Sequence, residues 1–287
     1  MSTVRVIPRL DIKGPNLVKG IHLEGLRVLG RPEDFARYYY EAGADELIYQ
    51  DVVASLYQRN SLLEFVSRTA QEIFVPLTVG GGLRTLGDIS AALAAGADKV
   101  AINTAAIRDP ELIRQAARRF GASTIVVAIE AIRQPDATYL AYTDNGREHT
   151  GIDAIEWAAT VEQLGAGEIL ATSVDRDGTG DGFDLELTRN IAARVSIPVI
   201  AHGGAGSPAD VIEVIRAANV DAVTVASLLH YDALRHIARD GCVPGEGNTE
   251  FLKSGRGTTR IQSTTLQQLK RELAAAGVSV RCEVSPA

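Results

Sequence analysis

A glycine-rich segment that occurs twice constrains the fold of this chain more than any other feature. Pro76 to Gly82 reads PLTVGGG, and Pro198 to Gly204 reads PVIAHGG. Each copy is followed by a helix-like segment and then by a further apolar run. The prolines at positions 76 and 198 are 122 residues apart, which is too far for a solenoid repeat and close to half of one large domain. We interpret the chain as one half-domain that occurs twice.

The two glycine clusters also predict anion sites. A strand that ends in glycines and opens a helix presents free backbone N–H groups at the positive end of the helix dipole, and these attract phosphate. Two copies indicate two phosphate sites on one face, and therefore a substrate that is phosphorylated at both ends. The alternative is that the glycines only allow tight turns between strand and helix.

Short apolar runs alternate with helical segments along the chain, and they are continuously apolar, as strands of a parallel sheet covered on both faces are. Eight βα units favour a closed (β/α)8 TIM barrel built from two duplicated half-barrels. An open doubly wound sheet is the alternative, and the duplication disfavours it. The predicted strands are residues 4–11, 46–51, 75–80, 99–103, 124–130, 168–173, 198–201 and 222–226.

The whole chain, residues 1–287, is predicted to form this single barrel, with half-barrels at about 1–122 and 123–239. Within it, two connections are longer than the others. Residues 13–27 are predicted to be a loop, and residues 134–150 an inserted loop or hairpin. After the barrel, glycine-rich residues 240–262 are predicted to be a flexible insertion, and residues 263–287 a final helix and tail.

Composition excludes several classes of function. The formal net charge is −7 and the basic residues are scattered, which does not match a nucleic-acid-binding surface. Cys242 and Cys282 form neither a disulfide framework nor a metal-binding spacing, so we expect no metal and no cofactor. The first apolar strand leaves no room for a signal peptide, and no apolar run reaches membrane-spanning length. We therefore expect a cytoplasmic protein with neither nucleic-acid nor membrane partners.

Polar residues that end the predicted strands are candidates for chemistry, because a barrel of this kind carries its active site at the carboxyl ends of its strands. They are Asp11, Asp51, Asn103, Glu130, Ser173, Asp175, Asp177 and His202. Asp11 and Glu130 are equivalent in the two halves and are predicted to face each other across the mouth. Such a pair can divide the roles of acid and base. The alternative is that each carboxylate only caps a helix or binds a loop.

A second group of charged residues stands at the starts of predicted strands one, two, four and six. These side chains should converge on the barrel axis at its N-terminal face, where two cations and two anions can form a closed ring of ion pairs. The alternative is an ordinary solvated rim. The residues are Arg5, Glu46, Lys99 and Glu168.

Taken together, these motifs resemble the cyclase subunit of imidazole glycerol phosphate synthase. The resemblance covers nearly the whole chain apart from about residues 240–262. A sister isomerase of histidine biosynthesis shares the half-barrel duplication and is less similar through residues 175–179. The motifs that carry the resemblance are residues 9–13 (RLDIK), 18–20 (VKG), 43–46 (GADE), 76–82, 103–104 (NT), 165–168 (GAGE), 175–179 (DRDGT) and 203–206 (GGAG).

The resemblance implies a lyase that acts as a cyclase. In that family, ammonia released from glutamine by a separate glutaminase passes along the barrel. It attacks a bis-phosphorylated phosphoribulosyl derivative of aminoimidazole carboxamide ribonucleotide. The products are imidazole glycerol phosphate and aminoimidazole carboxamide ribotide. The implied partners are therefore a glutaminase subunit at the N-terminal face, near Asp98, and a small bis-phosphorylated substrate.

The resemblance also implies roles for residues, by match of motif. Asp11 and Glu130 stand at the two catalytic positions, and Lys19 lies in a mobile loop that covers the substrate. One phosphate site matches Gly82, Asn103 and Thr104, and the other matches Asp177, Gly178, Gly204, Ala226 and Ser227. The family's ammonia gate matches Arg5, Glu46, Lys99 and Glu168.

Three substitutions and the 240–262 insertion depart from the family pattern. Glu130 stands where the family has aspartate, Arg9 where it usually has cysteine, and His202 where it has a small serine. These differences leave two alternatives open. One is a paralogue that delivers ammonia for the amidation of a surface-polysaccharide sugar, and the other is a non-catalytic scaffold that activates a glutaminase.

Overall fold

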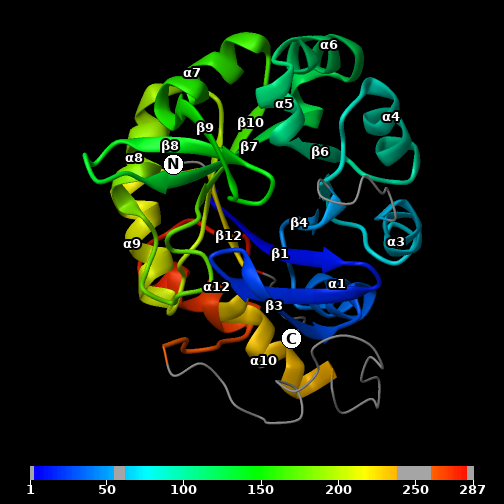
Figure 1. The fold of residues 1–287 in the computed structure, drawn as a ribbon. Coiled ribbons are helices and arrows are strands. Elements are labelled where there is room, and N and C mark those ends of the chain that lie inside the picture. The colour runs from blue at the N-terminus through cyan, green and yellow to red at the C-terminus, as the bar shows by residue number, and fades with distance from the viewer. Residues whose placement is uncertain (1–2, 55–61, 238–259, 283–287) are drawn as a thin grey trace.

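Helices surround a central set of strands in the computed structural model (Figure 1). The structure describes residues 3–54, 62–237 and 260–282. Most of the predicted insertion at 240–262 therefore lies outside the described residues, as does the end of the predicted tail.

The barrel wall is a closed ring of parallel strands, as the sequence predicted. Each wall strand pairs with the next wall strand along the chain, including β7 with β10, and the last strand, β12, pairs with β1 to close the ring. The open doubly wound sheet is therefore wrong. The wall strands are β1 (Arg5–Lys13), β4 (Leu47–Asp51), β5 (Leu77–Gly80), β6 (Lys99–Ile102), β7 (Ile125–Arg133), β10 (Glu168–Ser173), β11 (Val199–His202) and β12 (Ala222–Val225).

Helices connect successive wall strands and pack against their outer faces. A short 3-10 turn at Ala122–Thr124 precedes β7. The helices are α1 (Pro32–Glu41), α3 (Leu62–Thr69), α4 (Leu86–Ala94), α5 (Thr104–Arg108), α6 (Glu111–Phe120), α7 (Ala154–Leu164), α8 (Leu185–Arg194), α9 (Pro208–Ala218), α10 (Ser227–Ile237) and α12 (Leu266–Ala275). The last of these is the predicted final helix.

Two hairpins extend the wall strands at the mouth. The predicted loop at 13–27 is wrong: β2 (Asn16–Ile21) and β3 (Glu24–Gly30) form an antiparallel hairpin there, and β2 pairs with the end of β1. The glycines and proline in this segment hide its strand pattern, although residues 16–20 are all buried. The insertion at 134–150 is a hairpin, which is one of the two forms predicted for it. It is built from β8 (Tyr139–Thr143) and β9 (Glu148–Asp153), and β8 pairs with β7.

Because β1 and β7 both continue into hairpins, Asp11 and Glu130 do not end their strands as predicted. They lie two and three residues before the strand ends at Lys13 and Arg133. Among the described residues, the order of strands and α-helices from β1 to α5 thus repeats from β7 to α10, although the boundary between half-barrels remains a prediction.

The duplicated glycine segments extend into matching helix starts. Three residues after Gly82, Thr85 caps α4 and forms a capping box with Asp88. Ser207 stands at the same offset from Gly204 and forms a capping box with Asp210 at the start of α9. A reciprocal bond of this kind satisfies two backbone donors that a helix start otherwise leaves free. The sequence repeat is therefore a repeat of local structure as well.

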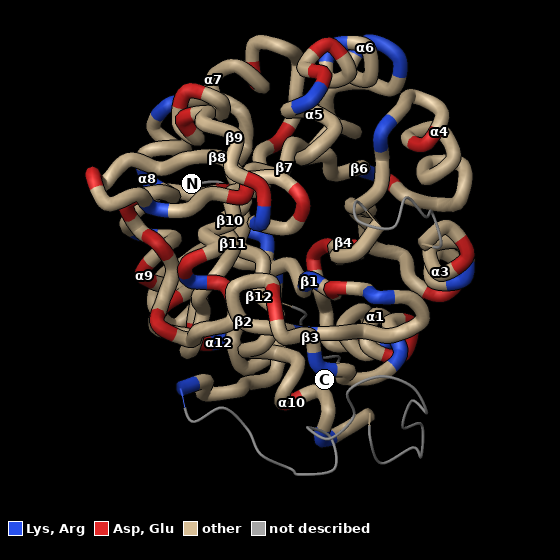
Figure 2. The backbone as a smooth tube through the Cα atoms, viewed as in Figure 1, with Lys and Arg blue, Asp and Glu red and all other residues tan. Residues whose placement is uncertain are grey.

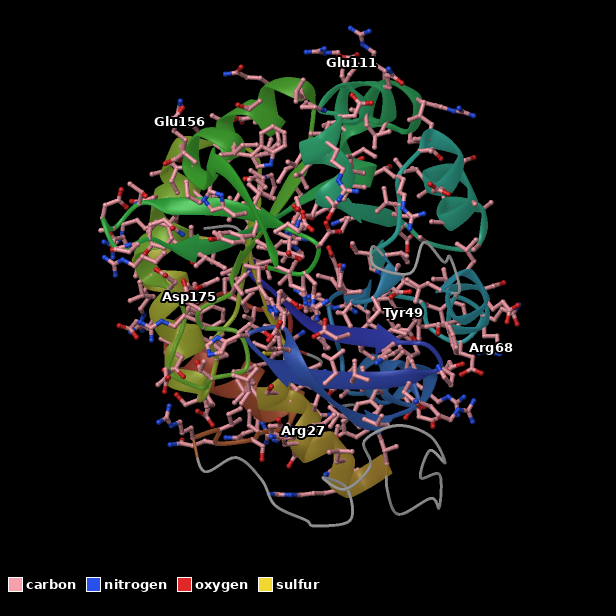
Figure 3. All side chains as sticks on the ribbon, viewed as in Figure 1. Arg27, Tyr49, Arg68, Glu111, Glu156 and Asp175 are labelled. Carbon is pink, nitrogen blue, oxygen red and sulfur yellow. The ribbon has the colours of Figure 1, made fainter. Side chains whose placement is uncertain are left out.

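Side chains alternate between the inside of the barrel and the helix layer, because successive strand residues point to opposite faces. The inward positions at mid-height form one apolar cluster, whose members are Ile7, Ile48, Ala101, Val126, Ala128, Leu170, Ile200 and Ala222. The outward positions join the large core beneath the helices. Tyr49, for example, lies between the wall and α3, where its hydroxyl is 2.7 Å from that of Thr69 (Figure 3).

The outer helices carry interspersed acidic and basic residues (Figure 2). Glu111 and Glu156 project outward from α6 and α7 (Figure 3). Among the described residues, no helix is long and apolar enough to cross a membrane. Within the same ranges, no group of three or more His, Cys, Asp or Glu side chains is placed to hold a metal ion.

Candidate active site at the barrel mouth

The first glycine cluster borders a pocket of about 200 Å3 at the mouth. Gly82, Asn103 and Thr104, predicted to form one phosphate site, all line it. Arg84 and Arg108 line it too, which adds positive charge to a pocket that already has backbone donors at the start of α5. The pocket reaches the barrel axis at Glu130. The structure therefore brings the predicted residues together beside one of the two candidate catalytic carboxyl groups.

The second glycine cluster borders a much smaller space of about 20 Å3, which is room for about one water molecule. Its lining includes all the residues predicted for the second phosphate site together with Lys19, namely Lys19, Asp177, Gly178, Gly204, Ala226 and Ser227. The Ser227 hydroxyl at the start of α10 is buried without a hydrogen-bond partner among the described residues. A phosphate group can enter only if neighbouring atoms move.

Close backbone approach explains the glycines of this second site. Gly204 has a φ of +108°, and a Cβ there would lie 2.0 Å from the carbonyl oxygen of Gly182. Gly178 has a φ of +73°, and its Cβ would lie 2.3 Å from the carbonyl oxygen of Gly20 in the β2–β3 hairpin. Any side chain at either position would force the loops apart.

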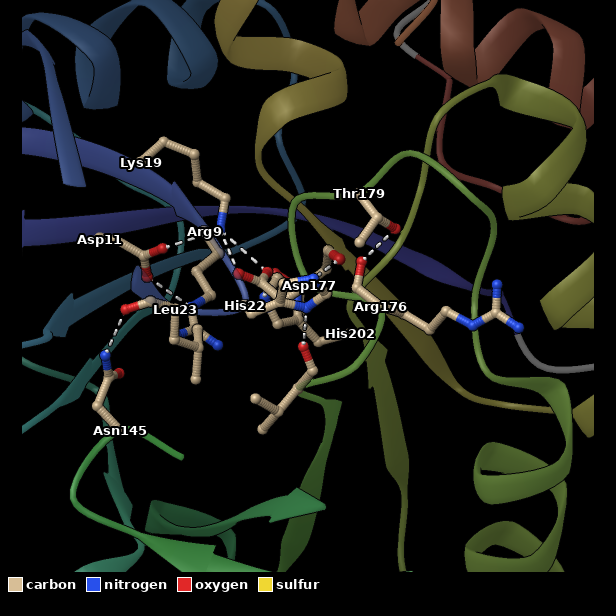
Figure 4. Close-up of polar contacts among 12 residues, drawn as sticks. Arg9, Asp11, Lys19, His22, Leu23, Asn145, Arg176, Asp177, Thr179 and His202 are labelled. Atoms are coloured by element: carbon tan, nitrogen blue, oxygen red, sulfur yellow. Dashed lines mark hydrogen bonds and ion pairs between the residues drawn. The ribbon is translucent and has the colours of Figure 1, made fainter. Parts of the chain in front are cut away.

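Asp11 lies in a buried network of charges at the centre of the mouth (Figure 4). Arg9 Nε donates to Asp11 Oδ1 at 2.8 Å, and Lys19 Nζ lies 3.3 Å from Asp11 Oδ2. All three residues are at most 3% exposed. Burial alone would raise the pKa of Asp11, but the charges of Arg9 and Lys19 outweigh it and hold that pKa below its usual value. Asp11 is therefore a carboxylate at neutral pH.

Asp177 joins this network from the loop after β10. Lys19 Nζ donates to both of its oxygens, at 3.0 and 2.8 Å, and His202 Nε2 lies 3.3 Å from Oδ1 (Figure 4). Burial opposes the ionisation of Asp177, yet Lys19 and His202 hold its pKa far below the usual range. Burial and the nearby Arg9 charge lower the pKa of His202, and its contact with Asp177 opposes this in part. Its other nitrogen, Nδ1, is 3.1 Å from the carbonyl oxygen of Thr224.

Glu130 has a different environment, although it is just as deep in the mouth. Its Oε2 accepts the backbone N–H of Gly146 at 2.8 Å, and no described cation lies within ion-pair distance of it. Burial raises the pKa of Glu130 to about 7, and the more distant charge of Arg9 opposes this only in part. The two candidate catalytic groups are therefore unlike near neutral pH: Asp11 is ionised, whereas the pKa of Glu130 lies close to neutral pH.

One buried residue behind the mouth could not be assigned from sequence. His230 was predicted only to start the region after the last strand, but it lies in α10 and is fully buried. Its Nε2 is 2.9 Å from the carbonyl oxygen of Arg9, so that nitrogen must donate, and its Nδ1 accepts from the hydroxyl of Tyr39 at 2.7 Å. Burial lowers the pKa of His230 to about 4. The only sequence signal was its helical spacing, three residues after Ser227.

The remaining strand-end residues serve local structure. Asp51 Oδ1 accepts the backbone N–H groups of Val53 and Ala54, which fits the capping alternative. Asp175 accepts the N–H of Arg133 at 2.7 Å, outside the buried network. Ser173 is buried at the end of β10. Lys19 is also not in a loop, because it belongs to β2 and is 3% exposed.

The opposite end of the barrel carries a closed ring of ion pairs, here called the charge ring (Arg5, Glu46, Lys99 and Glu168). Arg5 contacts Glu46 at 2.7 Å and also contacts Glu168. Lys99 contacts the same two carboxylates, at 3.2 and 3.0 Å. The carboxylates are 6–8% exposed and the cations 19–23%. This arrangement excludes the simple solvated rim, and the apolar inner layer separates the ring from the mouth.

Comparison with known proteins adds a family match. The sequence profile described as "Histidine biosynthesis protein" matches residues 5–235. The chain is 59% identical over 206 residues to imidazole glycerol phosphate synthase subunit HisF of Legionella pneumophila, an alignment that spans 72% of this chain and 97% of the relative. It is 48% identical over 252 residues to the same subunit of Trichormus variabilis, spanning 85% and 98%. The names of these relatives do not support the polysaccharide-amidation or scaffold alternatives.

Proposed function

The chain belongs to the histidine biosynthesis protein family, and we propose that it is the cyclase subunit of an imidazole glycerol phosphate synthase. It is an enzyme of histidine biosynthesis, and its chemistry places it among the lyases. Ammonia and the bis-phosphorylated phosphoribulosyl substrate meet at the barrel mouth. The products are imidazole glycerol phosphate and aminoimidazole carboxamide ribotide.

The observation that carries this function is a pair of unlike carboxyl groups between two glycine-bordered pockets. Glu130 lines the first pocket, and Lys19, which is bonded to Asp11, lines the second. A substrate with a phosphate group at each end would therefore lie across both. Ammonia addition followed by cleavage needs one group to accept a proton and another to supply one. Asp11, held ionised, takes the first role, and Glu130 takes the second.

Ammonia reaches the mouth from the opposite end of the barrel in this proposal. A glutaminase subunit binds the N-terminal face, near Asp98, and releases ammonia at the charge ring. Beyond the ring, the inner layer is apolar. Neutral ammonia crosses such a layer at low cost, whereas ammonium does not, because a buried unpaired charge is strongly disfavoured. The layer therefore favours the nucleophilic form of the substrate.

Turnover of the phosphoribulosyl substrate with ammonium salt, by the purified chain alone, tests the proposal. We expect activity that is lost by on the order of 10²-fold or more in Asp11→Asn, as general acid–base groups contribute. Glu130→Asp should change the rate without abolishing it, because the carboxyl group is kept and moved by about 1 Å. A wild-type chain without turnover, with ammonium salt or with a glutaminase and glutamine, would refute the proposed function.

A further inference from the structure

We propose that Arg9 is a positioning residue for this reaction: its guanidinium orients the Asp11 carboxylate and balances its charge, so that Glu130 is left as the acidic group without a cation of its own. This inference deepens the proposed function and depends on it. Arg9 does not line either pocket, and it acts through Asp11.

The backbone of β1 places Arg9 and Asp11 on the same side of the strand. The two residues are two apart, so both point into the barrel, and Arg9 Nε donates to Asp11 Oδ1 at 2.8 Å. The carbonyl group of Arg9 is held in turn by His230 Nε2 at 2.9 Å. Arg9 and Asp11 are each 2% exposed. A buried guanidinium fixed at backbone and side chain in this way determines where the carboxylate can point.

The charges that face Asp11 come from every side of the mouth. They are Arg9 from β1, Lys19 from β2, Asp177 from the loop after β10, with the imidazole rings of His202 on β11 and His230 on α10. Arg9 and Lys19 are two cations that balance the two carboxylates of Asp11 and Asp177. Glu130 is a further buried carboxyl group with no paired cation among the described residues, so burial raises its pKa.

Lys19 cannot provide this balance by itself. Its ammonium lies nearer to Asp177, at 2.8 and 3.0 Å, than to Asp11, at 3.3 Å, and it also lines the second phosphate pocket. A phosphate group in that pocket would compete for Lys19. Arg9 has no such second duty, and a guanidinium stays charged over the whole working range of pH. Asp11 therefore keeps one constant cation throughout the reaction.

The pH profile of kcat/KM tests this role, measured at a constant concentration of un-ionised ammonia. Arg9→Met removes the charge, which raises the pKa of both Asp11 and Glu130, since a cation favours the ionised form of each. The limb set by Asp11 as base and the limb set by Glu130 as acid should then both move to higher pH. We expect the whole bell-shaped profile to move by about one pH unit. A merely structural role would lower the profile without moving it.

Three further variants make the outcome decisive. Arg9→Lys keeps the charge, so its profile should stay in place while kcat falls. Arg9→Gln keeps a donor without the charge and should move the profile as Arg9→Met does, which serves if that variant does not fold. Arg133→Met, at an exposed arginine on the rim, should match wild type. An active Arg9→Met or Arg9→Gln enzyme with an unmoved profile overturns the inference, whereas an inactive wild type overturns the proposed function instead.

Discussion

At the scale of single residues, the mouth separates two carboxyl groups by their neighbours and not by their depth. Asp11 and Glu130 are 2% and 8% exposed, yet cations hold one ionised while burial keeps a proton on the other. Sequence could indicate both as a symmetric pair. It could not indicate which of them is charged, because Lys19, Asp177 and His202 come from three separate elements.

Glu130 should lower the stability of the protein in the pH range where it works. Burial raises its pKa from 4.5 to about 7, so the unfolded chain releases this proton at lower pH than the folded protein does. Stability is therefore lost as pH rises from about 4.5 through 7, by roughly 3 kcal/mol for this group. In Glu130→Gln, we expect higher stability than wild type at pH 8, little difference at pH 4.5, and much reduced turnover.

Urea unfolding at the two pH values measures this difference. Asp45→Asn is a suitable comparison, because the Asp45 side chain is 7% exposed and lies 2.8 Å from Lys270 Nζ, so this buried carboxylate has a cation of its own. That variant should not gain stability at pH 8. If Glu130→Gln were less stable than wild type at pH 8, Glu130 would be a structural carboxylate and its assigned role as proton donor would be wrong.

At the scale of elements, the β2–β3 hairpin restricts the second phosphate site. The N–H of His22 donates to the carbonyl group of Asp177 at 2.8 Å, and Asn145 Nδ2 donates to the carbonyl group of Leu23 at 3.0 Å. These bonds join the hairpin to the loops after β10 and β8. With the hairpin in this position the second phosphate site holds about 20 Å3. Binding of the substrate therefore requires the hairpin or its lysine to move.

The wall strands could be predicted from the sequence because they are continuous apolar runs between glycine and proline signals. The hairpin at 13–27 could not, because Gly20 and Gly25 interrupt the strand pattern and the partner strand is an extension of β1. The second hairpin was easier to find, because Tyr139 to Thr143 is rich in β-formers and Asp144-Asn145-Gly146 favours a tight turn. The close approach of Gly178 to the backbone of Gly20 could not be predicted from the sequence pattern.

Asn145→Gly should release the first hairpin. Residue 145 has a φ of +62°, which glycine adopts freely, so the turn is kept while the bond to Leu23 is lost. We expect faster amide hydrogen exchange in residues 16–30, because opening the hairpin no longer has to break this bond. Asn145→Asp, which cannot donate at neutral pH, should behave alike. Unchanged exchange in both variants would show that this bond does not hold the hairpin.

At the scale of the whole molecule, the barrel interior has three layers. The charge ring lies at one end, the apolar layer in the middle and the buried ionic network at the mouth. The alternation of inward and outward residues could be anticipated from the strand pattern. A closed ring of the four charges could be predicted only beside the alternative of a solvated rim, since the choice between them depends on the barrel radius and on the reach of Arg5 and Lys99.

Lys99→Met should uncouple glutamine use from product formation. The variant leaves Arg5 alone with two carboxylates, so the ring is no longer neutral and its packing changes. With the glutaminase present, we expect more glutamate than imidazole glycerol phosphate to be formed. Turnover with ammonium salt should persist, because the mouth is untouched. Lys13→Met, at an exposed lysine, should keep the two products equal, and an equal yield in Lys99→Met would contradict the gate assignment.

Phe74→Ser should weaken binding of the glutaminase. Phe74 lies between α3 and β5 at the N-terminal face, is 79% exposed and packs against Tyr40 with ring centroids 6.0 Å apart. Covering such a side chain contributes about 1.5–3 kcal/mol, so we expect a Kd about 10- to 100-fold higher by titration calorimetry. Ile21→Ser removes the other large apolar side chain that is exposed among the described residues, on the hairpin at the opposite face, and should bind as wild type. Equal affinity of both variants would place the partner elsewhere.

The geometry of the charge ring has a consequence for how a passage through it could open. Each cation contacts both carboxylates, so a cation that moves away from one carboxylate also disturbs its contact with the other. Withdrawing Lys99 breaks two contacts together and leaves the three remaining groups with a net negative charge, which favours its return. Partial opening thus costs nearly as much as full opening. The ring should therefore have two states, closed and open. A partner that opens it would have to compensate for the loss of both Lys99 contacts in one step.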